Sequence, residues 1–193
     1  MAAEVIRRSP AAVLTLDEVR EQCRIDADLT DDDTLLQMIE RAAVASAEAR
    51  IGGPLLLAEC RETLDAWPGL PWLYLEIAGG REVVGIEALQ QGQRQPLPLE
   101  AFHIERGERR LCIKPLQGWP AVDPVPGAIA IVYRAGFAEA GPDVPEDVRQ
   151  WLRFRVATLY AFREEVSAGS VVALPDSLVD SLIAHYRPTE SPL

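Results

Sequence analysis

Apolar and small residues in the first quarter of the chain recur every three or four positions, which is the spacing of a helix face. Thr15-Leu-Asp-Glu18 and Thr30-Asp-Asp-Asp33 each place a hydroxyl three residues before a carboxylate, as in a capping box that opens a helix. Gly52-Gly53-Pro54 ends the second helix. The pattern therefore predicts two helices between Thr15 and Ile51. The second is expected to carry an apolar stripe at Leu35, Leu36, Met38, Ile39, Ala42, Ala43 and Ser46.

Between residues 55 and 137 the pattern changes to short apolar runs separated by Pro and Gly, which is typical of strands and turns. Val84 with Ile86, and Leu111 with Ile113, stand at alternate positions, which predicts one buried and one exposed face. The region is therefore expected to form a small antiparallel sandwich or barrel. The expected strands are Ala58 to Ala66, Trp72 to Ile77, Glu82 to Leu89, Phe102 to Glu105, Arg110 to Ile113 and Ala128 to Tyr133.

Helical spacing returns in the last quarter of the chain. Val144-Pro-Glu-Asp147 has proline at a first helical position and carboxylates in the first turn, so a long helix is expected from there to about Val166. A shorter helix is expected to begin at Pro175-Asp176-Ser177 and to end at Pro188, with Leu178, Val179, Leu182 and Ile183 inward. The long helix is predicted to pack through Val148, Trp151, Leu152, Val156, Leu159 and Phe162, with Arg149, Arg153 and Arg163 on or beside the edge of this stripe.

These three parts predict an α+β protein. Residues 1–54 and 138–193 are expected to form a helical body of about four helices, with residues 55–137 as an inserted antiparallel β domain. The two ends of the inserted domain are then expected to lie close together.

The composition excludes some classes of partner. The 193-residue chain has a formal net charge of -11, whereas a nonspecific binder of nucleic acid or anionic membrane needs clustered cations. No window reaches the ~18 apolar residues of a membrane span, and no signal peptide is recognised, so a soluble cytoplasmic protein is expected. Cys23, Cys60 and Cys112 are odd in number and widely spaced, which predicts neither a disulfide framework nor a zinc site.

The sharpest ligand-like pattern is the alternate spacing of Asp26, Asp28, Thr30 and Asp32, which resembles a calcium loop. The sixth position of such a loop requires glycine and the twelfth glutamate, and here they are aspartate and glutamine. We therefore expect a solvated loop with capping carboxylates, and no metal or cofactor.

Other candidate chemistry is equally sparse. His103 and His185 have no acid and nucleophile beside them in a recognisable order, so both are interpreted as structural. A Ser-His-Asp arrangement stays open at this stage, because its members can be distant along the chain. One basic cluster, in which glutamates are interleaved, is expected to form a hairpin with paired charges. It consists of Arg106, Arg109, Arg110 and Lys114.

Two groups of segments carry a family resemblance. The first runs from Leu14-Thr-Leu-Asp-Glu-Val-Arg through Arg24-Ile-Asp and Asp31-Asp-Asp-Thr-Leu-Leu-Gln-Met-Ile-Glu-Arg-Ala-Ala to Gly53-Pro-Leu. The second comprises Trp119-Pro, Ile131-Val-Tyr-Arg-Ala-Gly-Phe137, Val144-Pro-Glu-Asp-Val-Arg-Gln150 and Leu159-Tyr-Ala-Phe-Arg-Glu164. In this order, from about Ser9 to Arg187, they resemble the phage head-tail connector (adaptor) family, in the version with a β insertion between its helices.

The resemblance implies a structural subunit that forms a ring of about twelve copies beneath the portal protein of a tailed phage, prophage or gene-transfer particle. Such a ring extends the DNA channel without binding DNA specifically, and docks the next tail-completion protein. The family has no catalytic, metal or cofactor residues to carry over, so the chain is expected not to be an enzyme and to have no membrane partner. It would be made in the cytoplasm of a bacterial host and end at the head-tail junction. Its matching positions are fold positions, at Leu35, Ile39, Val148, Leu152, Val156 and Tyr160.

Two sets of residues are expected to serve this assembly. An acidic set is expected to face the channel or its rim, where like charge keeps DNA from sticking. It consists of Asp26, Asp28, Asp31, Asp32 and Asp33. A second set is assigned to contacts with a neighbouring subunit or partner, unless its helix arginines are solvated rim residues. It consists of Arg149, Arg153, Arg163, Tyr186 and Arg187.

Two further expectations complete this interpretation. The tail after Tyr186 is expected to become ordered against the portal or a tail protein. Two other classes of function remain open, an enzyme and a small-molecule-binding regulatory module, each with a cleft between the helical body and the β insertion.

Overall fold

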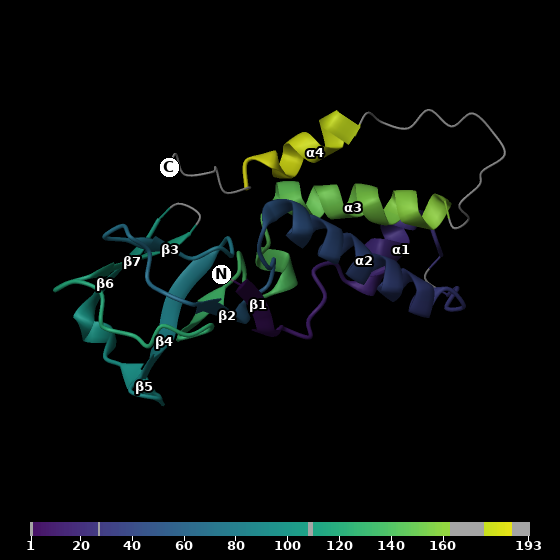
Figure 1. The fold of residues 1–193 in the computed structure, drawn as a ribbon. Helices are drawn as coiled ribbons and strands as arrows, with labels where there is room; N and C mark the ends of the chain where they lie inside the picture. The colour runs from purple at the N-terminus through teal and green to yellow at the C-terminus, as the bar shows by residue number, and fades with distance from the viewer. Residues whose placement is uncertain (1, 27, 108–109, 163–175, 187–193) are drawn as a thin grey trace. The chain divides into compact units, whose positions relative to one another are not determined.

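The computed structural model describes residues 2–26, 28–107, 110–162 and 176–186 (Figure 1). Its contacts divide the chain into two compact units. Residues 1–9 and 52–137 form a β unit, and residues 10–51 and 138–193 form a helical unit, so the chain passes between the units at three places. Four helices and antiparallel sheets confirm the α+β class.

The helical unit contains α1 (Leu16–Cys23), α2 (Asp33–Ile51), α3 (Glu146–Ala161) and α4 (Asp176–Ala184). The capping box predicted at Thr15 is confirmed, because its side chain accepts from Glu18 N while the Glu18 side chain accepts from Thr15 N. The second expected box differs. Although α2 begins at Asp33, this carboxylate is bound by Arg20 and does not reach back to Thr30.

The buried face of α3 follows the predicted stripe through its first three turns. Val148, Trp151, Leu152 and Val156 are buried, and the stripe is confirmed there. At the carboxyl end the prediction was wrong, because Leu159 and Phe162 are 40% and 39% exposed. On α2, similarly, Met38 and Ala42 face solvent, and the buried positions are Leu36, Ile39, Glu40, Ala43, Ala47 and Ile51.

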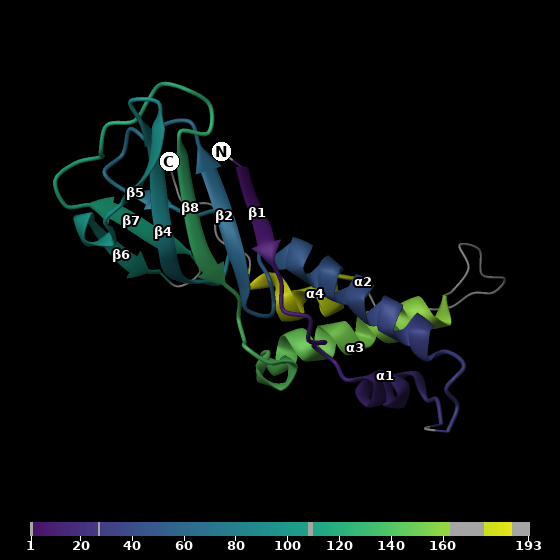
Figure 2. The ribbon, with the colours of Figure 1, turned by 90° about the horizontal axis from the view of Figure 1, so that it is seen from below.

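The β unit contains two antiparallel sheets. Five strands pair in the order β1-β2-β8-β4-β5, and three in the order β3-β7-β6; Figure 2 shows β1, β2, β8 and β4 side by side. Their bounds are β1 (Ala2–Arg7), β2 (Ala58–Leu64), β3 (Leu73–Tyr74), β4 (Gly80–Gln90), β5 (Gln93–Leu97), β6 (Phe102–Arg106), β7 (Leu111–Pro115) and β8 (Ile129–Ala135).

Two strands were not predicted, and both are edge strands. The segments of β1 and β5 are short and rich in small, charged or amide side chains, so they give little period-two apolar signal. Because β1 pairs with β2, residues 1–9 lie in the β unit, whereas the sequence prediction placed residues 1–54 in the helical body.

The core of the β unit lies between its sheets and includes Cys60, Leu75, Ile113, Ile131 and Tyr133, none of them exposed. Trp67 and Trp119 stack at 4.6 Å between ring centroids and pack on this core.

A register shift on β4 changes one predicted face. The shift lies between Val83 and Gly85, where β4 pairs with β8. As a result Val83 and Ile86 are buried while Val84 is exposed, so the prediction that Val84 and Ile86 share a face was wrong.

Candidate functional site

Arg149 on α3 is buried inside the helical unit, with 7% of its side chain exposed. Its Nη1 donates hydrogen bonds to the carbonyl oxygens of Val13 and Gly141, both at 2.8 Å, and its Nη2 donates to Glu18. The guanidinium therefore joins the segment before α1, α1 itself and the turn before α3. The sequence assigned Arg149 to a contact with another subunit, but its donors are engaged within its own chain.

A buried carboxylate holds the same segment through its amides. Glu40 Oε1, on α2, accepts hydrogen bonds from Val13 N at 2.9 Å and Leu14 N at 3.3 Å. Burial raises the pKa of Glu40, and the hydrogen bonds from these amides act against that rise. Val13 is thus fixed by Glu40 through its amide and by Arg149 through its carbonyl. We call this pair, Glu40 and Arg149, the clamp.

Arg153 lies one turn further along α3 and is partly exposed. Its Nη2 lies 3.2 Å from Glu18 Oε1, and its Nη1 donates to Glu146. The hydrogen bond from Arg153 to Glu146 raises the pKa of the guanidinium. Burial acts to raise the pKa of Glu18, but a hydrogen bond from the Thr15 amide and the two neighbouring arginines outweigh it, so the pKa is lowered.

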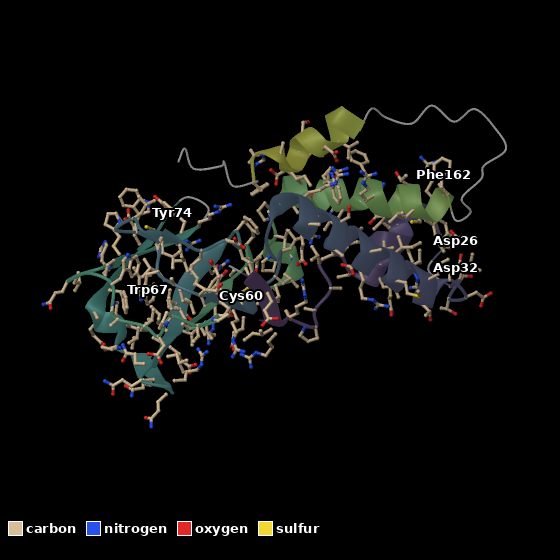
Figure 3. All side chains as sticks on the ribbon, viewed as in Figure 1. Asp26, Asp32, Cys60, Trp67, Tyr74 and Phe162 are labelled. Carbon is tan, nitrogen blue, oxygen red and sulfur yellow. The ribbon has the colours of Figure 1, made fainter. Side chains whose placement is uncertain are left out.

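The acidic set divides into two groups. Asp26, Asp28 and Asp31 are exposed in the connection between α1 and α2. Asp32 and Asp33 are half-buried and have partners. Tyr160 OH donates to Asp32 Oδ2 at 2.7 Å, and Arg20 Nη2 lies 2.6 Å from both carboxylate oxygens of Asp33. These last two aspartates therefore tie the start of α2 to α3 and α1. Figure 3 shows Asp26, Asp32 and Phe162 at the same end of the helical unit.

Tyr186, just beyond α4, is anchored on the first turn of α3. Its hydroxyl donates to Asp147, with oxygen–oxygen distances of 2.9 and 3.1 Å, and His185 Nε2 lies 3.2 Å from the same carboxylate. Burial and the hydrogen bond to this carboxylate raise the pKa of Tyr186 to about 12. Arg163, Arg187 and the tail 188–193 lie outside the described residues.

The β unit buries the carboxylate of Glu62. Its Oε2 accepts hydrogen bonds from Glu76 N at 2.9 Å and Tyr133 OH at 3.2 Å, whereas Oε1 has no partner among the described residues. Burial raises the pKa of Glu62 above its ordinary value. The group lies inside the apolar core, so we interpret it as part of the fold.

In the described part of the chain, no three His, Cys, Asp or Glu side chains gather as metal ligands would. None of its helices is long and apolar enough to cross a bilayer.

The sequence interpretation missed a group of exposed apolar side chains on the β unit. Trp72 and Tyr74 alternate with the buried Leu73 and Leu75, and this period-two spacing was the available signal. The group is Leu70, Trp72, Tyr74 and Leu116, each between 38% and 64% exposed.

The negative charge is concentrated in the helical unit. That unit holds 19 of the 30 Asp and Glu residues and 9 of the 19 Lys and Arg residues, so its formal charge is -10. The β unit holds the other 11 acidic and 10 basic residues, for a formal charge of -1. The two units therefore offer electrostatically different surfaces to a partner.

Residues 13–79 match the model of a family described as phage gp6-like head-tail connector protein. This stretch covers α1, α2 and the first strands after α2. No curated protein matches the chain.

Solved structures match along the whole chain. A chain of the neck of the empty gene transfer agent (GTA) particle, computed with C6 symmetry, has a TM-score of 0.83 and 26% identity, with 100% of this chain and 98% of that chain covered. A chain of the native GTA virion has a TM-score of 0.82 and 26% identity over the same shares. A chain of the native GTA neck, computed with C12 symmetry, has a TM-score of 0.78 and 24% identity, again over 100% and 98% of the two chains, and shares the fold.

The segment order, the family match and the two GTA structures above 25% identity agree with one another. They confirm the resemblance recognised in the sequence, which is to the phage head-tail connector family.

Proposed function

We propose that this chain is a structural head-tail connector, an adaptor subunit that forms a ring in the neck of a phage-like particle. The observation that carries the proposal is the match to a chain of the empty GTA particle neck, with a TM-score of 0.83. Because 100% of this chain and 98% of the other are covered, the likeness includes both units and not one shared module.

The ring follows from the symmetry of the similar structures. Necks computed with C6 and C12 symmetry are cyclic assemblies, which favours a cyclic arrangement of about twelve copies for this chain as well. We infer that the ring sits beneath a portal protein, docks the next tail-completion protein and surrounds a passage for DNA. The subunit would be made in the host cytoplasm and reach the head-tail junction by assembly.

The acidic charge supports a passage that does not bind DNA. We propose that Asp26, Asp28 and Asp31, which are exposed, face the channel or its rim and repel the phosphate backbone. Arg153 and Tyr186 are proposed to border contacts with a neighbour, because both are only partly buried.

We also propose that residues 55–137 are an insertion into a helical body, completed by a strand from the start of the chain. The first and last strands of the insertion, β2 and β8, pair directly, so its two ends are close, as an insertion requires.

A structural role is proposed in place of catalysis. Residues 13–79 match the model of a connector family, and the ionised side chains of Arg149, Arg153 and Glu18 bind one another or backbone groups within the helical unit. An enzyme or a regulatory ligand-binding module would instead bind a small molecule, and this binding would raise the melting temperature of the purified chain.

Electron microscopy of particles from the host tests the proposal. Deletion of the gene is expected to leave filled or empty heads without attached tails, and expression of the chain from a plasmid is expected to restore joined particles. A ring of density between portal and tail that fits this fold would complete the test. Joined particles from the deletion strain would refute it.

A further inference from the structure

α4 docks on the helical unit through one face. Asp180, Ile183 and Tyr186 stand three residues apart, which places them on one side of a helix, and Tyr186 N donates to the Ile183 carbonyl at 3.1 Å. Ile183 is 2% exposed, and the Tyr186 hydroxyl donates to Asp147 in the first turn of α3. A helix of 9 residues is shorter than the about 12–15 residues that a helix needs to be stable alone in water, so this docking face keeps α4 folded.

The surface that receives α4 is cationic and is built around an indole ring. Trp151 is fully buried, and the guanidinium carbons of Arg50 and Arg155 lie 5.8 and 5.3 Å from the centroid of its ring. Asp180 of α4 contacts all three side chains. It accepts hydrogen bonds from Trp151 Nε1 at 3.1 Å and from Arg50 Nη1 at 2.6 Å, and its Oδ1 lies 3.8 Å from Arg155 Nη2. We call Arg50, Asp147, Trp151 and Arg155 the receiving surface.

The receiving surface selects its occupant by charge. Two guanidinium groups beside one ring repel each other, and the indole N–H of Trp151 needs an acceptor because its side chain is buried. A carboxylate on an apolar helix meets both requirements, and Asp180 near the buried Ile183 supplies it here. Asp147, at the other end of the surface, accepts a hydrogen bond from a tyrosine hydroxyl. The complement of the receiving surface is therefore a helix with the side chains of α4.

The connection between α3 and α4 is longer than docking within one chain requires. α3 ends at Ala161 and α4 begins at Asp176, so the 14 residues 162–175 separate them. Figure 1 shows α4 lying along α3, and Asp180 contacts Trp151, which is about 15 Å before the end of α3 at 1.5 Å per residue. A connection of this length extends up to about 46 Å, whereas packed helices are usually joined by about 2–8 residues. It therefore has the length to place α4 on an adjacent copy.

We propose that in the ring α4 of one copy docks on the receiving surface of the next copy. The contacts are the same as those within one chain, so the exchange of α4 between copies sacrifices none of them. The docking face of α4 and the receiving surface are different surfaces, so their contact is heterologous, as a closed ring of identical subunits requires. Neighbours in a ring are present at a high effective concentration, which favours docking between copies. The proposal rests on the ring function and specifies one of its interfaces.

Two variants of the full chain separate the two sides of this contact. The donor-defective variant carries Asp180→Lys and Ile183→Ser, so its α4 cannot dock while its receiving surface stays intact. The receiver-defective variant carries Arg50→Glu and Arg155→Glu, so its α4 is intact while its receiving surface is reversed in charge. Circular dichroism establishes that each variant folds. The donor-defective variant is isotope-labelled, and the indole NMR signal of its Trp151 reports whether a carboxylate is bound there.

The Trp151 signal of the donor-defective variant alone is expected to differ from that of wild type, because the indole N–H loses its hydrogen bond to Asp180. Addition of the unlabelled receiver-defective chain, up to about 1 mM, is expected to move the signal back to the wild-type position, because the intact α4 of the added chain docks there. The unlabelled donor-defective chain is the matched control and is expected to leave the signal unmoved. A signal that the receiver-defective chain does not move, or that the control moves equally, overturns the proposal.

Crosslinking in assembled particles gives an independent readout. Glu146→Cys and His185→Cys in one chain place two exposed thiols at the edge of the contact, since His185 lies 3.2 Å from Asp147, the residue after Glu146. Both substitutions spare the buried part of the docking face. The background carries Cys23→Ser, and its other two cysteines are buried. A short bismaleimide is expected to join neighbouring chains into a ladder of multimers on a denaturing gel.

The matched control carries Met38→Cys and Ala42→Cys, which lie one turn apart on the exposed side of α2 and are expected to be joined only within a chain. Absence of multimers from the first pair, or a ladder from both pairs, contradicts the exchange of α4. The ring function fails separately, in the particle experiment. A ring seen between portal and tail in which each α4 docks on its own chain refutes this interface and leaves the connector role intact.

Discussion

Replacing Arg149 with methionine keeps most of the buried aliphatic stem and removes the donors of the clamp. The carbonyls of Val13 and Gly141 each lose a 2.8 Å hydrogen bond from a charged group, in surroundings where Arg149 itself is 7% exposed. Hydrogen bonds to charged groups contribute about 1.5–3 kcal/mol each. The ion pair of Arg149 with the partly exposed Glu18 adds little to the free energy of unfolding, because solvent screens the attraction between the two charges. The expected loss of unfolding free energy is therefore about 3–5 kcal/mol.

Urea unfolding followed by circular dichroism at 222 nm measures this loss, since the helical unit supplies most of that signal. A loss of this size lowers the melting temperature by roughly 10 °C in a chain of this length. Arg153→Met is the matched control. Among the described residues Arg153 pairs with the partly exposed Glu18 and the exposed Glu146, so its replacement is expected to cost about 1 kcal/mol or less. Equal losses for the two variants, or a loss below about 1 kcal/mol for Arg149→Met, would show that the clamp does not hold the unit together.

Three further predictions concern other parts of the fold. Burial raises the folded pKa of Glu62 above its unfolded value of about 4.3, so its stabilising contribution is complete below that pH and is lost as pH rises through the folded pKa. Glu62→Gln removes this dependence, and the stability of the variant relative to wild type is expected to rise with pH above about 4.3, by at most about 1.4 kcal/mol per pH unit in urea titrations. Gly136→Ala is expected to destabilise the β unit by about 1–3 kcal/mol in tryptophan-monitored unfolding, because Gly136 has φ +146° and a Cβ would lie 2.7 Å from Leu57 Cα. Tyr160→Phe removes the hydrogen bond to Asp32 and is expected to cost about 1 kcal/mol in thermal unfolding, while an unchanged melting temperature would show that this bond does not stabilise the fold.

The predictable parts of the fold are those with local causes. The capping box at Thr15 and the strands β2, β6, β7 and β8 depend on residues a few positions apart, and periodicity located them. The pattern did not predict β1 and β5, because an edge strand needs few apolar residues and its pairing partner is determined by the tertiary structure.

The candidate site depended more on distant residues. The spacing of Arg149 along α3 is that of a residue at the edge of the apolar stripe. One of its hydrogen-bond acceptors is the carbonyl of Val13, 136 positions earlier in the chain, and no local sequence pattern predicts a contact between residues so far apart. Leu159 and Phe162 have the spacing of core residues, and only the packing of the other helices decides that they remain exposed. The exposed Asp26, Asp28 and Asp31 agree with the predicted solvated loop, because a carboxylate that stays exposed keeps its hydration.

The three passages of the chain between the two units have a mechanical consequence. They fall at residues 9–10, 51–52 and 137–138, so a force that pulls the units apart is shared among three covalent strands. A protease that cuts one passage leaves the units tethered by the other two. In a connector subunit, tension between the two units would then be divided among the three passages, so no single bond would carry the whole load.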